Sequence, residues 1–292
     1  MAVAESLSVL VCGATGQQGG ALARTLLEKG HCVRAFTRRP DSPEARELER
    51  LGAKLAEGDY EDPSTIENAA RGVDAVFVVA TPFEAGTEAE ARHAIAAANA
   101  AKAAGVGHLV YSSVANADKE TGIPHFESKR QVEQHLEGLG IPYTIVAPVY
   151  IMENLLSPWI LPELKEGRFP MALPASRALQ QVALSDIAGF AALVLENRDE
   201  FVGSRLDIAS DELAGEEVAE VLTRVTEREI HYVELPLEHV RQAMGEDGAR
   251  MLEWFDRVGY SADSAGLRRD HPEVGWHTFE EWAKEQTWSA LE

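Results

Sequence analysis

Three glycines near the N-terminus have a spacing that can hold a phosphate group. Gly13, Gly16 and Gly19 follow a short apolar run at 7–12 and precede a segment at 21–29 with leucines at helical spacing. In a strand, loop and helix unit the first glycine allows a tight turn, and the second lets the backbone approach a pyrophosphate. The third lets the helix pack close to the strand, and the N–H groups at the helix start favour phosphate charge. The pattern predicts a dinucleotide-binding loop, and the alternative is a glycine turn without a ligand.

Two arginines stand where the next strand is expected to end. Arg38 and Arg39 follow the run at 32–36, where an NAD site usually has a carboxylate that binds the ribose hydroxyls. A guanidinium can bind a 2′-phosphate through two hydrogen bonds, whereas a carboxylate would repel it. The sequence therefore predicts NADP rather than NAD as the cofactor. In the alternative, both arginines are ordinary surface side chains.

Polar residues also follow the next two strand-like runs. Asp59 and Tyr60 come after 54–57, and Thr81 comes after 75–80. Ligands of open α/β sheets bind beyond the carboxyl ends of the strands. We therefore expect all three residues to contribute to cofactor binding. Asp59 would accept a hydrogen bond from the adenine amino group, and the backbone at Thr81 would pass the nicotinamide half. In the alternative, Asp59 caps a turn.

The segments that would position these residues alternate between strand and helix. The run at 75–80 is apolar throughout, which is typical of a strand buried on both faces. The alternation predicts a doubly wound parallel sheet of the Rossmann type in an α/β domain at 1–154. At 155–292 we expect a smaller mixed α/β domain, with some chain returning to the first sheet. The expected helices lie at 45–51, 63–70, 88–104, 128–139, 185–196 (capped by Ser185) and 216–225, and further strands at 106–113, 142–147, 205–208 and 230–235.

The composition excludes several classes of protein. The 292 residues carry a net charge of −21, which argues against direct nucleic-acid binding because phosphates need a basic surface. There is no apolar run of membrane-helix length and no basic stretch of the kind that begins a secretory signal. We expect a cytoplasmic protein that binds no membrane. Cys12 and Cys32 are expected to be buried free thiols, and the histidines lack metal-ligand spacing.

Short segments along the chain share their residues with a known family: GATGQQGG, TRRP, GDYED, VYSSVAN, HFESK and TFEEW. In these segments the sequence resembles the NmrA-like family of atypical short-chain dehydrogenase/reductases, over nearly the whole chain. The resemblance implies a Rossmann domain with a smaller C-terminal domain and NADP(H) as the cofactor. It assigns cofactor binding to Gly13, Thr15, Gly16, Gln17, Gln18, Arg38, Asp59, Thr81 and Lys129.

The resemblance also places two candidate catalytic residues. Lys129 matches the lysine of a Tyr-x-x-x-Lys pattern whose tyrosine donates the proton, but His125 stands at the tyrosine position. Lys129 would hold ribose hydroxyls, and His125 could donate a proton near neutrality. The alternatives are a solvated helix lysine and a loop or cap histidine.

The missing tyrosine decides which function we expect first. Redox-sensor members of the family also lack it, which favours a redox-sensing or regulatory NADP(H) binder with a regulatory protein partner. The alternative is an NADPH-dependent oxidoreductase that reduces quinones or other small carbonyl compounds. In either case Pro148 and Tyr150, within 148–154, would cover the nicotinamide, although Tyr150 is equally suited to the core. Ser112 and Ser113 would line the nicotinamide pocket, or instead cap a helix or satisfy the end of their strand.

Overall fold

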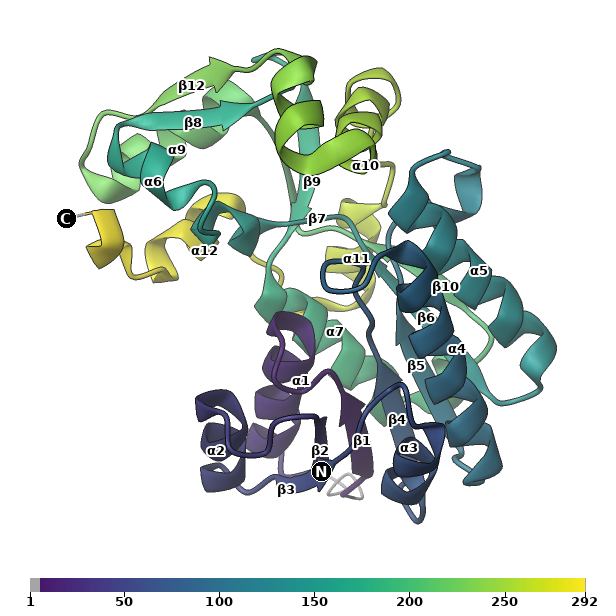
Figure 1. The fold of residues 1–292 in the computed structure, drawn as a ribbon. Coiled ribbons are helices and arrows are strands. Elements are labelled where there is room, and N and C mark those ends of the chain that lie inside the picture. The colour runs from purple at the N-terminus through teal and green to yellow at the C-terminus, as the bar shows by residue number, and fades with distance from the viewer. Residues whose placement is uncertain (1–5, 292) are drawn as a thin grey trace. The chain divides into compact units, whose positions relative to one another are not determined.

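The computed structural model describes residues 6–291, which form two compact units (Figure 1). Unit 1 contains the described residues up to Ala117 together with His125–Ala147 and Ile187–Leu206. Unit 2 contains Asp118–Pro124, Pro148–Asp186 and the chain from Asp207 onward. Within residues 6–291, no helix has both the length and the apolar character needed to cross a membrane.

Unit 1 is built on a seven-stranded sheet with the strand order β10-β6-β5-β4-β1-β2-β3. The chain runs outward from β1 through β2 to β3 and then crosses back to β4 on the other side of β1. The pairs β1–β2, β2–β3, β1–β4, β4–β5 and β5–β6 are all parallel, so the predicted doubly wound Rossmann sheet is confirmed. The strands are β1 (Ser8–Cys12), β2 (Cys32–Thr37), β3 (Lys54–Glu57), β4 (Ala75–Val78), β5 (His108–Ser112), β6 (Tyr143–Pro148) and β10 (Arg205–Ile208).

Helices cover both faces of this sheet. Figure 1 shows α3, α4 and α5 along one face and α1 and α2 along the other. The buried side of α4 is almost entirely alanine, and these small side chains let the helix lie close to β4 and β5. The helices of this unit are α1 (Gln17–Glu28), α2 (Pro43–Arg50), α3 (Pro63–Ala70), α4 (Thr87–Ala103), α5 (Pro124–Leu139), α7 (Leu184–Glu196) and α8 (Arg198–Phe201).

Local signals in the sequence fix where two of these helices begin. Ser42 caps α2 by accepting a hydrogen bond from the N–H of Ala45, and Asp62 caps α3 in the same way through the N–H of Ser64. In both helices a proline occupies the first position, where its missing N–H costs nothing. These caps set the ends of the loops that follow β2 and β3.

Unit 2 has a mixed architecture, as expected. A three-stranded sheet has the order β11-β9-β7 and a two-stranded sheet pairs β12 with β8. The core includes Met152, Phe169, Leu222, Phe279 and Trp282. The strands are β7 (Tyr150–Ile151), β8 (Arg168–Met171), β9 (Ala178–Val182), β11 (Asp211–Ala214) and β12 (His231–Glu234), and the α-helices are α6 (Leu161–Lys165), α9 (Gly215–Thr226), α10 (Leu237–Arg257, kinked at Gly245), α11 (Ser264–Asp270) and α12 (Phe279–Glu285).

Two local expectations were wrong. Ser185 does not cap α7, because it lies inside the first turn of that helix. The N–H of Leu184 instead donates to both carboxylate oxygens of Glu153, at 3.1 and 3.0 Å. Cys32 is exposed because it is the first residue of β2, whereas Cys12 is buried, and burial raises the pKa of its thiol to about 12.

Candidate functional site

The glycine loop after β1 is a tight turn that requires two of its glycines. Gly13 has a φ of +75°, and its carbonyl accepts a hydrogen bond from the N–H of Gly16 at 2.9 Å. A Cβ at Gly19 would lie 2.3 Å from the oxygen of Gly13, so any side chain there would push the turn away from α1. The loop therefore has the close helix-to-strand packing that the sequence predicts for Gly19.

The start of α1 is open to an anion. Gly16 is the N-cap residue and is exposed, and within residues 6–291 no side chain caps this helix end. The first turn contains no acidic residue. Exposed Gln17 and half-buried Thr15 stand beside these uncapped N–H groups. A phosphate would meet both hydrogen-bond donors and the positive end of the helix dipole, so the loop fits the diphosphate of a dinucleotide.

Gln18 connects the glycine loop to the end of β5. Its Oε1 accepts a hydrogen bond of 2.6 Å from Oγ of Ser112, which is the last residue of that strand. The side-chain amide still has two N–H donors of its own. Gln18 therefore serves as a structural link and keeps donors for a ligand.

Arg38 directly follows β2 and forms an ion pair across the edge of the sheet. One of its terminal nitrogens donates to Oε2 of Glu84 at 2.7 Å, and the two side chains are 52% and 69% exposed. The hydrogen bond that Arg38 donates to Glu84 raises the pKa of Arg38, and Asp59 adds a smaller attraction. The predicted phosphate-binding guanidinium is thus present at the expected strand end, and a carboxylate that the sequence did not reveal is bound to it.

Asp59 and Tyr60 lie together after β3 but have different surroundings. Oδ1 of Asp59 accepts a hydrogen bond from the N–H of Glu61 at 3.0 Å, so the carboxylate stabilises its own turn. The hydroxyl of Tyr60 donates to the carbonyl oxygen of Val79 at 2.9 Å, and its ring stacks on His93 with centroids 5.5 Å apart. Burial raises the pKa of Tyr60 well above its usual value. Tyr60 therefore connects the ends of β3 and β4, and Thr81 follows β4 as an exposed residue.

Lys129 is held at the end of β4 by a buried carboxylate. Its Nζ lies 2.9 Å from Oε1 of Glu90 and donates to the carbonyl oxygen of Ala80 at 3.2 Å. The ammonium also lies 5.9 Å from the centre of the Tyr111 ring, a cation–π distance. Glu90 is fully buried, and its other oxygen accepts a 2.5 Å hydrogen bond from Oγ of Ser128. With 11% of its side chain exposed, Lys129 is not a solvated surface lysine.

His125 lies one helical turn before Lys129 on α5. Residues four apart share a face of a helix, so the imidazole and the ammonium point to the same side. The ring is half-buried and contacts the edge of Phe126, with centroids 4.8 Å apart. The carbonyl oxygen of His125 lies 3.0 Å from Oγ of Ser128, whose single proton is donated to Glu90. The position of His125 in the first turn of α5 is compatible with a histidine that only caps the helix and also with a catalytic role near Lys129.

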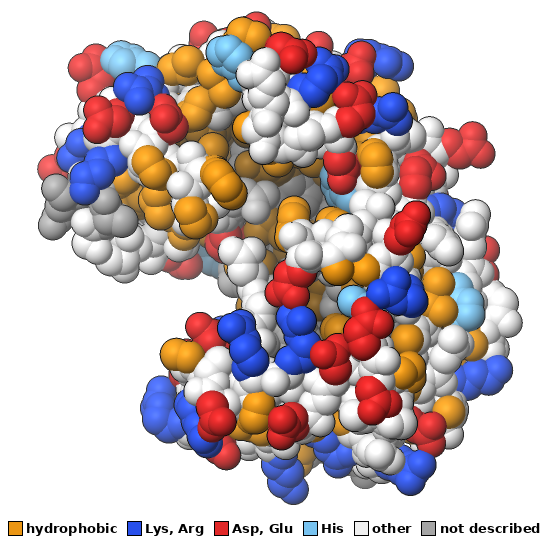
Figure 2. Space-filling view, in the orientation of Figure 1, with side chains coloured by type: hydrophobic (Ala, Val, Ile, Leu, Met, Phe, Trp, Pro, Cys, Tyr) orange, Lys and Arg blue, Asp and Glu red, His pale blue; other side chains and the backbone are white. Residues whose placement is uncertain are grey.

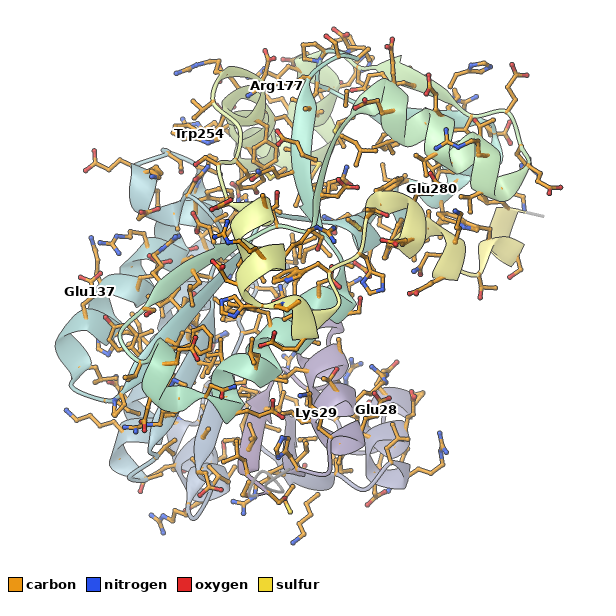
Figure 3. The ribbon with its side chains drawn as sticks, turned by 180° about the vertical axis from the view of Figure 1, so that it is seen from behind. Glu28, Lys29, Glu137, Arg177, Trp254 and Glu280 are labelled. Carbon is orange, nitrogen blue, oxygen red and sulfur yellow. The ribbon has the colours of Figure 1, made fainter. Side chains whose placement is uncertain are left out.

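A second buried carboxylate, Glu133, organises the segment after β5. It accepts a 2.5 Å hydrogen bond from Oγ of Ser113, and Nε of Arg205 lies 3.2 Å from each of its oxygens. A terminal nitrogen of Arg205 donates to the carbonyl of Val114 at 3.0 Å. Arg130 pairs with Glu133 at 3.2 Å and with the more exposed Glu137, labelled in Figure 3, at 2.9 Å. The hydroxyl of Ser113 is thus bound within the protein.

Sequence reasoning missed Glu90, Glu133 and Arg205. A signal for Glu90 existed, because it falls on the same helical face as Ala94, Ala97 and Ala101. A carboxylate on an apolar helical face is expected to be buried, and a buried charge must be paired. The identity of its partner could not be read from the pattern.

The predicted residues are thus gathered at one edge of the unit 1 sheet. The glycine loop, Arg38, Asp59, Tyr60 and Thr81 all follow the carboxyl ends of parallel strands, which meet at the same edge. Lys129 reaches the backbone at the end of β4 from α5. Within residues 6–291, no three His, Cys, Asp or Glu side chains are grouped to hold a metal ion.

The two remaining predicted residues, Pro148 and Tyr150, come where the chain leaves β6 and enters β7. Pro148 is the last residue of β6, and Tyr150 belongs to unit 2, where it begins β7 and pairs with Gln181. Burial raises the pKa of Tyr150 to about 12. The role of both residues in covering a nicotinamide stays a prediction.

Comparison with known proteins identifies the family. The model of the NmrA-like family matches residues 5–283. The chain belongs to the NmrA-like family. The family resemblance expected from the sequence is therefore confirmed, as is the fold that it implies.

Several proteins that are similar to this chain have named activities or were solved with a nucleotide. The NAD(P)H azoreductase of Xenophilus azovorans is 32% identical over 236 residues, which cover 81% of this chain and 80% of that protein. The NADPH-dependent quinone oxidoreductase QOR2 of Escherichia coli, solved with NADPH, has a TM-score of 0.79 at 24% identity and covers 94% of this chain and 98% of its own. The negative transcriptional regulator NmrA, solved with NADP, has a TM-score of 0.76 at 22% identity, with 96% and 95% covered. QOR2 and NmrA thus have the same fold as this chain.

Proposed function

We propose that this protein binds NADP(H) on unit 1. The observation that carries the proposal is the glycine loop, where a Cβ at Gly19 would collide with the turn and the exposed start of α1 has no side-chain cap. This loop would hold the diphosphate. Arg38, at the end of β2, would bind the 2′-phosphate, and Asp59 would lie on the adenine side. The NADP and NADPH in the solved relatives support the same assignment.

The chain's other residues would hold the nicotinamide half. When bound, NADP(H) supplies hydride transfer, and the protein supplies binding and orientation. Lys129 is kept in place by Glu90 and by the carbonyl of Ala80, so its ammonium is ready to hold ribose hydroxyls without a search through rotamers. Tyr60 fixes the carbonyl of Val79 just before this point and stiffens the strand end that the nicotinamide would pass.

The first role that we propose is redox sensing or regulation in the cytoplasm through a protein partner. It is supported by the replacement of a phenol by His125 one turn before Lys129, because a binder needs no proton donor. A sensor must hold NADP and NADPH with different affinities, or present a different surface with each. A basic partner surface would complement the net charge of −21.

A second role, as an NADPH-dependent reductase of quinones or other small carbonyl compounds, is favoured by a different observation. The azoreductase relative matches over four fifths of both chains. In this role His125 would deliver the proton that accompanies hydride transfer, since an imidazole can act as a general acid and the residue lies one helical turn before Lys129 on α5.

Two experiments test these proposals in order. Calorimetric titration of the whole protein with NADPH, NADP, NADH and NAD should show saturable binding with a preference for the phosphorylated forms. Absence of binding at millimolar nucleotide would remove both roles. NADPH oxidation with a panel of quinones and azo compounds then separates them: turnover that falls in His125→Ala while NADPH affinity is retained supports the reductase, and no turnover supports the sensor.

A further inference from the structure

The loop between β4 and α4 carries a carboxylate into the region of the 2′-phosphate. Residues 82–86 form a turn closed by a 2.8 Å hydrogen bond from the N–H of Gly86 to the carbonyl of Pro82. The turn stands out from the sheet, since Phe83 is 90% exposed. From it Glu84 reaches Arg38, 46 positions earlier in the chain, at 2.7 Å.

This contact uses the group on which cofactor selection depends. A guanidinium binds a phosphate through paired N–H donors, and Glu84 occupies a terminal nitrogen of Arg38. A phosphate and a carboxylate cannot share these donors without mutual repulsion. Asp59 adds a second negative charge to the surroundings of Arg38. The nearby carboxylates therefore oppose a 2′-phosphate at the same place where Arg38 attracts it.

The energy of the ion pair sets how strong this opposition can be. Both side chains are more than half exposed, and exposed ion pairs are weak because water screens them and because holding two long side chains costs entropy. A phosphate carries more charge than a carboxylate and can therefore displace Glu84. The turn offers no buried anchor for Phe83 or Glu84, so displacement requires no repacking of the core.

We propose that Glu84 is a specificity-determining residue, which competes with the 2′-phosphate for Arg38 and narrows the preference for NADP(H) over NAD(H). This inference rests on the proposed NADP(H) site. NAD(H) has no 2′-phosphate, so it can bind while Glu84 stays on Arg38. NADP(H) must break the ion pair first, and its measured affinity is lowered by the cost of that step.

The test compares nucleotide affinities of Glu84→Gln and wild type by calorimetry. We expect NADPH and NADP to bind about two- to five-fold more tightly to the variant, the range that follows from an exposed ion pair. NADH affinity should stay within about two-fold, since an ion pair that NADH leaves intact contributes nothing to its binding. Glu88→Gln is the matched control, because it removes the same charge four residues later from a side chain that faces a groove beside α3. It should leave all affinities unchanged.

A double variant distinguishes competition for Arg38 from a general change in charge. In an Arg38→Ala background, Glu84→Gln should improve NADPH binding no more than Glu88→Gln does. An equal gain with and without Arg38, or equal gains for NADPH and NADH, would overturn the proposal. If wild type binds NADPH and Glu84→Gln binds it no better, the inference about Glu84 fails alone. If wild type binds no nucleotide, the proposed function fails and the inference fails with it.

Discussion

Nζ of Lys129, on α5, lies 2.9 Å from Oε1 of Glu90, on α4, and Glu90 is fully buried. Such a pair is expensive to desolvate, and its geometry must be good to repay that cost. Here the other carboxylate oxygen accepts from Ser128, and the ammonium donates to the carbonyl of Ala80. The network fixes the position of Lys129 before any ligand arrives.

Removing the carboxylate should destabilise the protein strongly. In Glu90→Ala the ammonium of Lys129 loses its counter-ion inside the protein, and breaking a buried pair typically costs about 3–5 kcal/mol. Urea unfolding followed by circular dichroism would measure the loss. The double variant with Lys129→Met should recover part of it, because no unpaired charge remains. Glu137→Ala on the exposed side of α5 is the control and should cost less than about 1 kcal/mol. A Glu90→Ala loss as small as that of the control would show that the pair contributes little.

The glycine loop gives a second prediction. Gly19→Ala would place its Cβ 2.3 Å from the oxygen of Gly13, so the turn must move and the N–H groups of α1 would no longer face a diphosphate correctly. We expect weaker binding of both NADPH and NADH, together with a lower melting temperature. Gly138→Ala is the matched control, because that glycine lies in α5 with open space around it. Alanine favours helix by up to about 1 kcal/mol, so this control should be neutral or stabilising. Unchanged nucleotide affinity in Gly19→Ala would argue against the diphosphate site.

The sequence predicted those parts of the structure that local patterns encode. Apolar runs and helical leucine spacing located β1, α1 and the turn at Gly13 between them, because burial on both faces requires such runs. Their alternation predicted the parallel sheet, and the sheet in turn brings Arg38, Asp59 and Thr81 to one edge.

What the sequence could not predict are pairings between distant segments. Glu90 and Lys129 are 39 positions apart, and Glu133 and Arg205 are 72 apart, so only the folded chain shows that they meet. The ion pair of Arg38 with Glu84 is of the same kind. Figure 2 shows Lys and Arg side chains interspersed with Asp and Glu on the face viewed. Composition counts these charges but does not say which arginine lies beside which carboxylate.

Arg38 should discriminate between the two nicotinamide cofactors. Arg38→Ala should weaken NADPH binding by about 1.5–3 kcal/mol, the contribution of a hydrogen bond to a charged group, and should affect NADH much less. Calorimetric titration with both nucleotides measures the difference. Arg46→Ala is the control, because Arg46 is an exposed arginine on α2 that pairs with Asp41 and Glu49. Equal losses for NADPH and NADH in Arg38→Ala would mean that this guanidinium does not bind the 2′-phosphate.

His108 makes the stability of unit 1 depend on pH in a defined window. Oγ1 of Thr144 donates to the carbonyl of Phe201, so it must accept from Nε2 of His108, which lies 2.9 Å away. Nδ1 is buried and has no hydrogen-bond partner among the described residues, so a proton added there would be buried and unpaired. Burial, with a smaller repulsion from Arg198, lowers the pKa of His108 from 6.5 to about 4.

The sign of the effect follows from linkage. As the pH falls, the unfolded chain takes up the His108 proton around pH 6.5, whereas the folded chain takes it up only near pH 4. The stability that neutral His108 contributes to folding is therefore complete above pH 6.5 and is lost as the pH falls from 6.5 to about 4. Between pH 7 and pH 5 the loss should be about 2 kcal/mol. In His108→Gln the amide can still donate to Thr144 but does not titrate, so the decrease in unfolding free energy over this range should be smaller by that amount. The exposed His231→Gln should keep the wild-type slope. Parallel pH profiles for wild type and His108→Gln would show that His108 is not the titrating group.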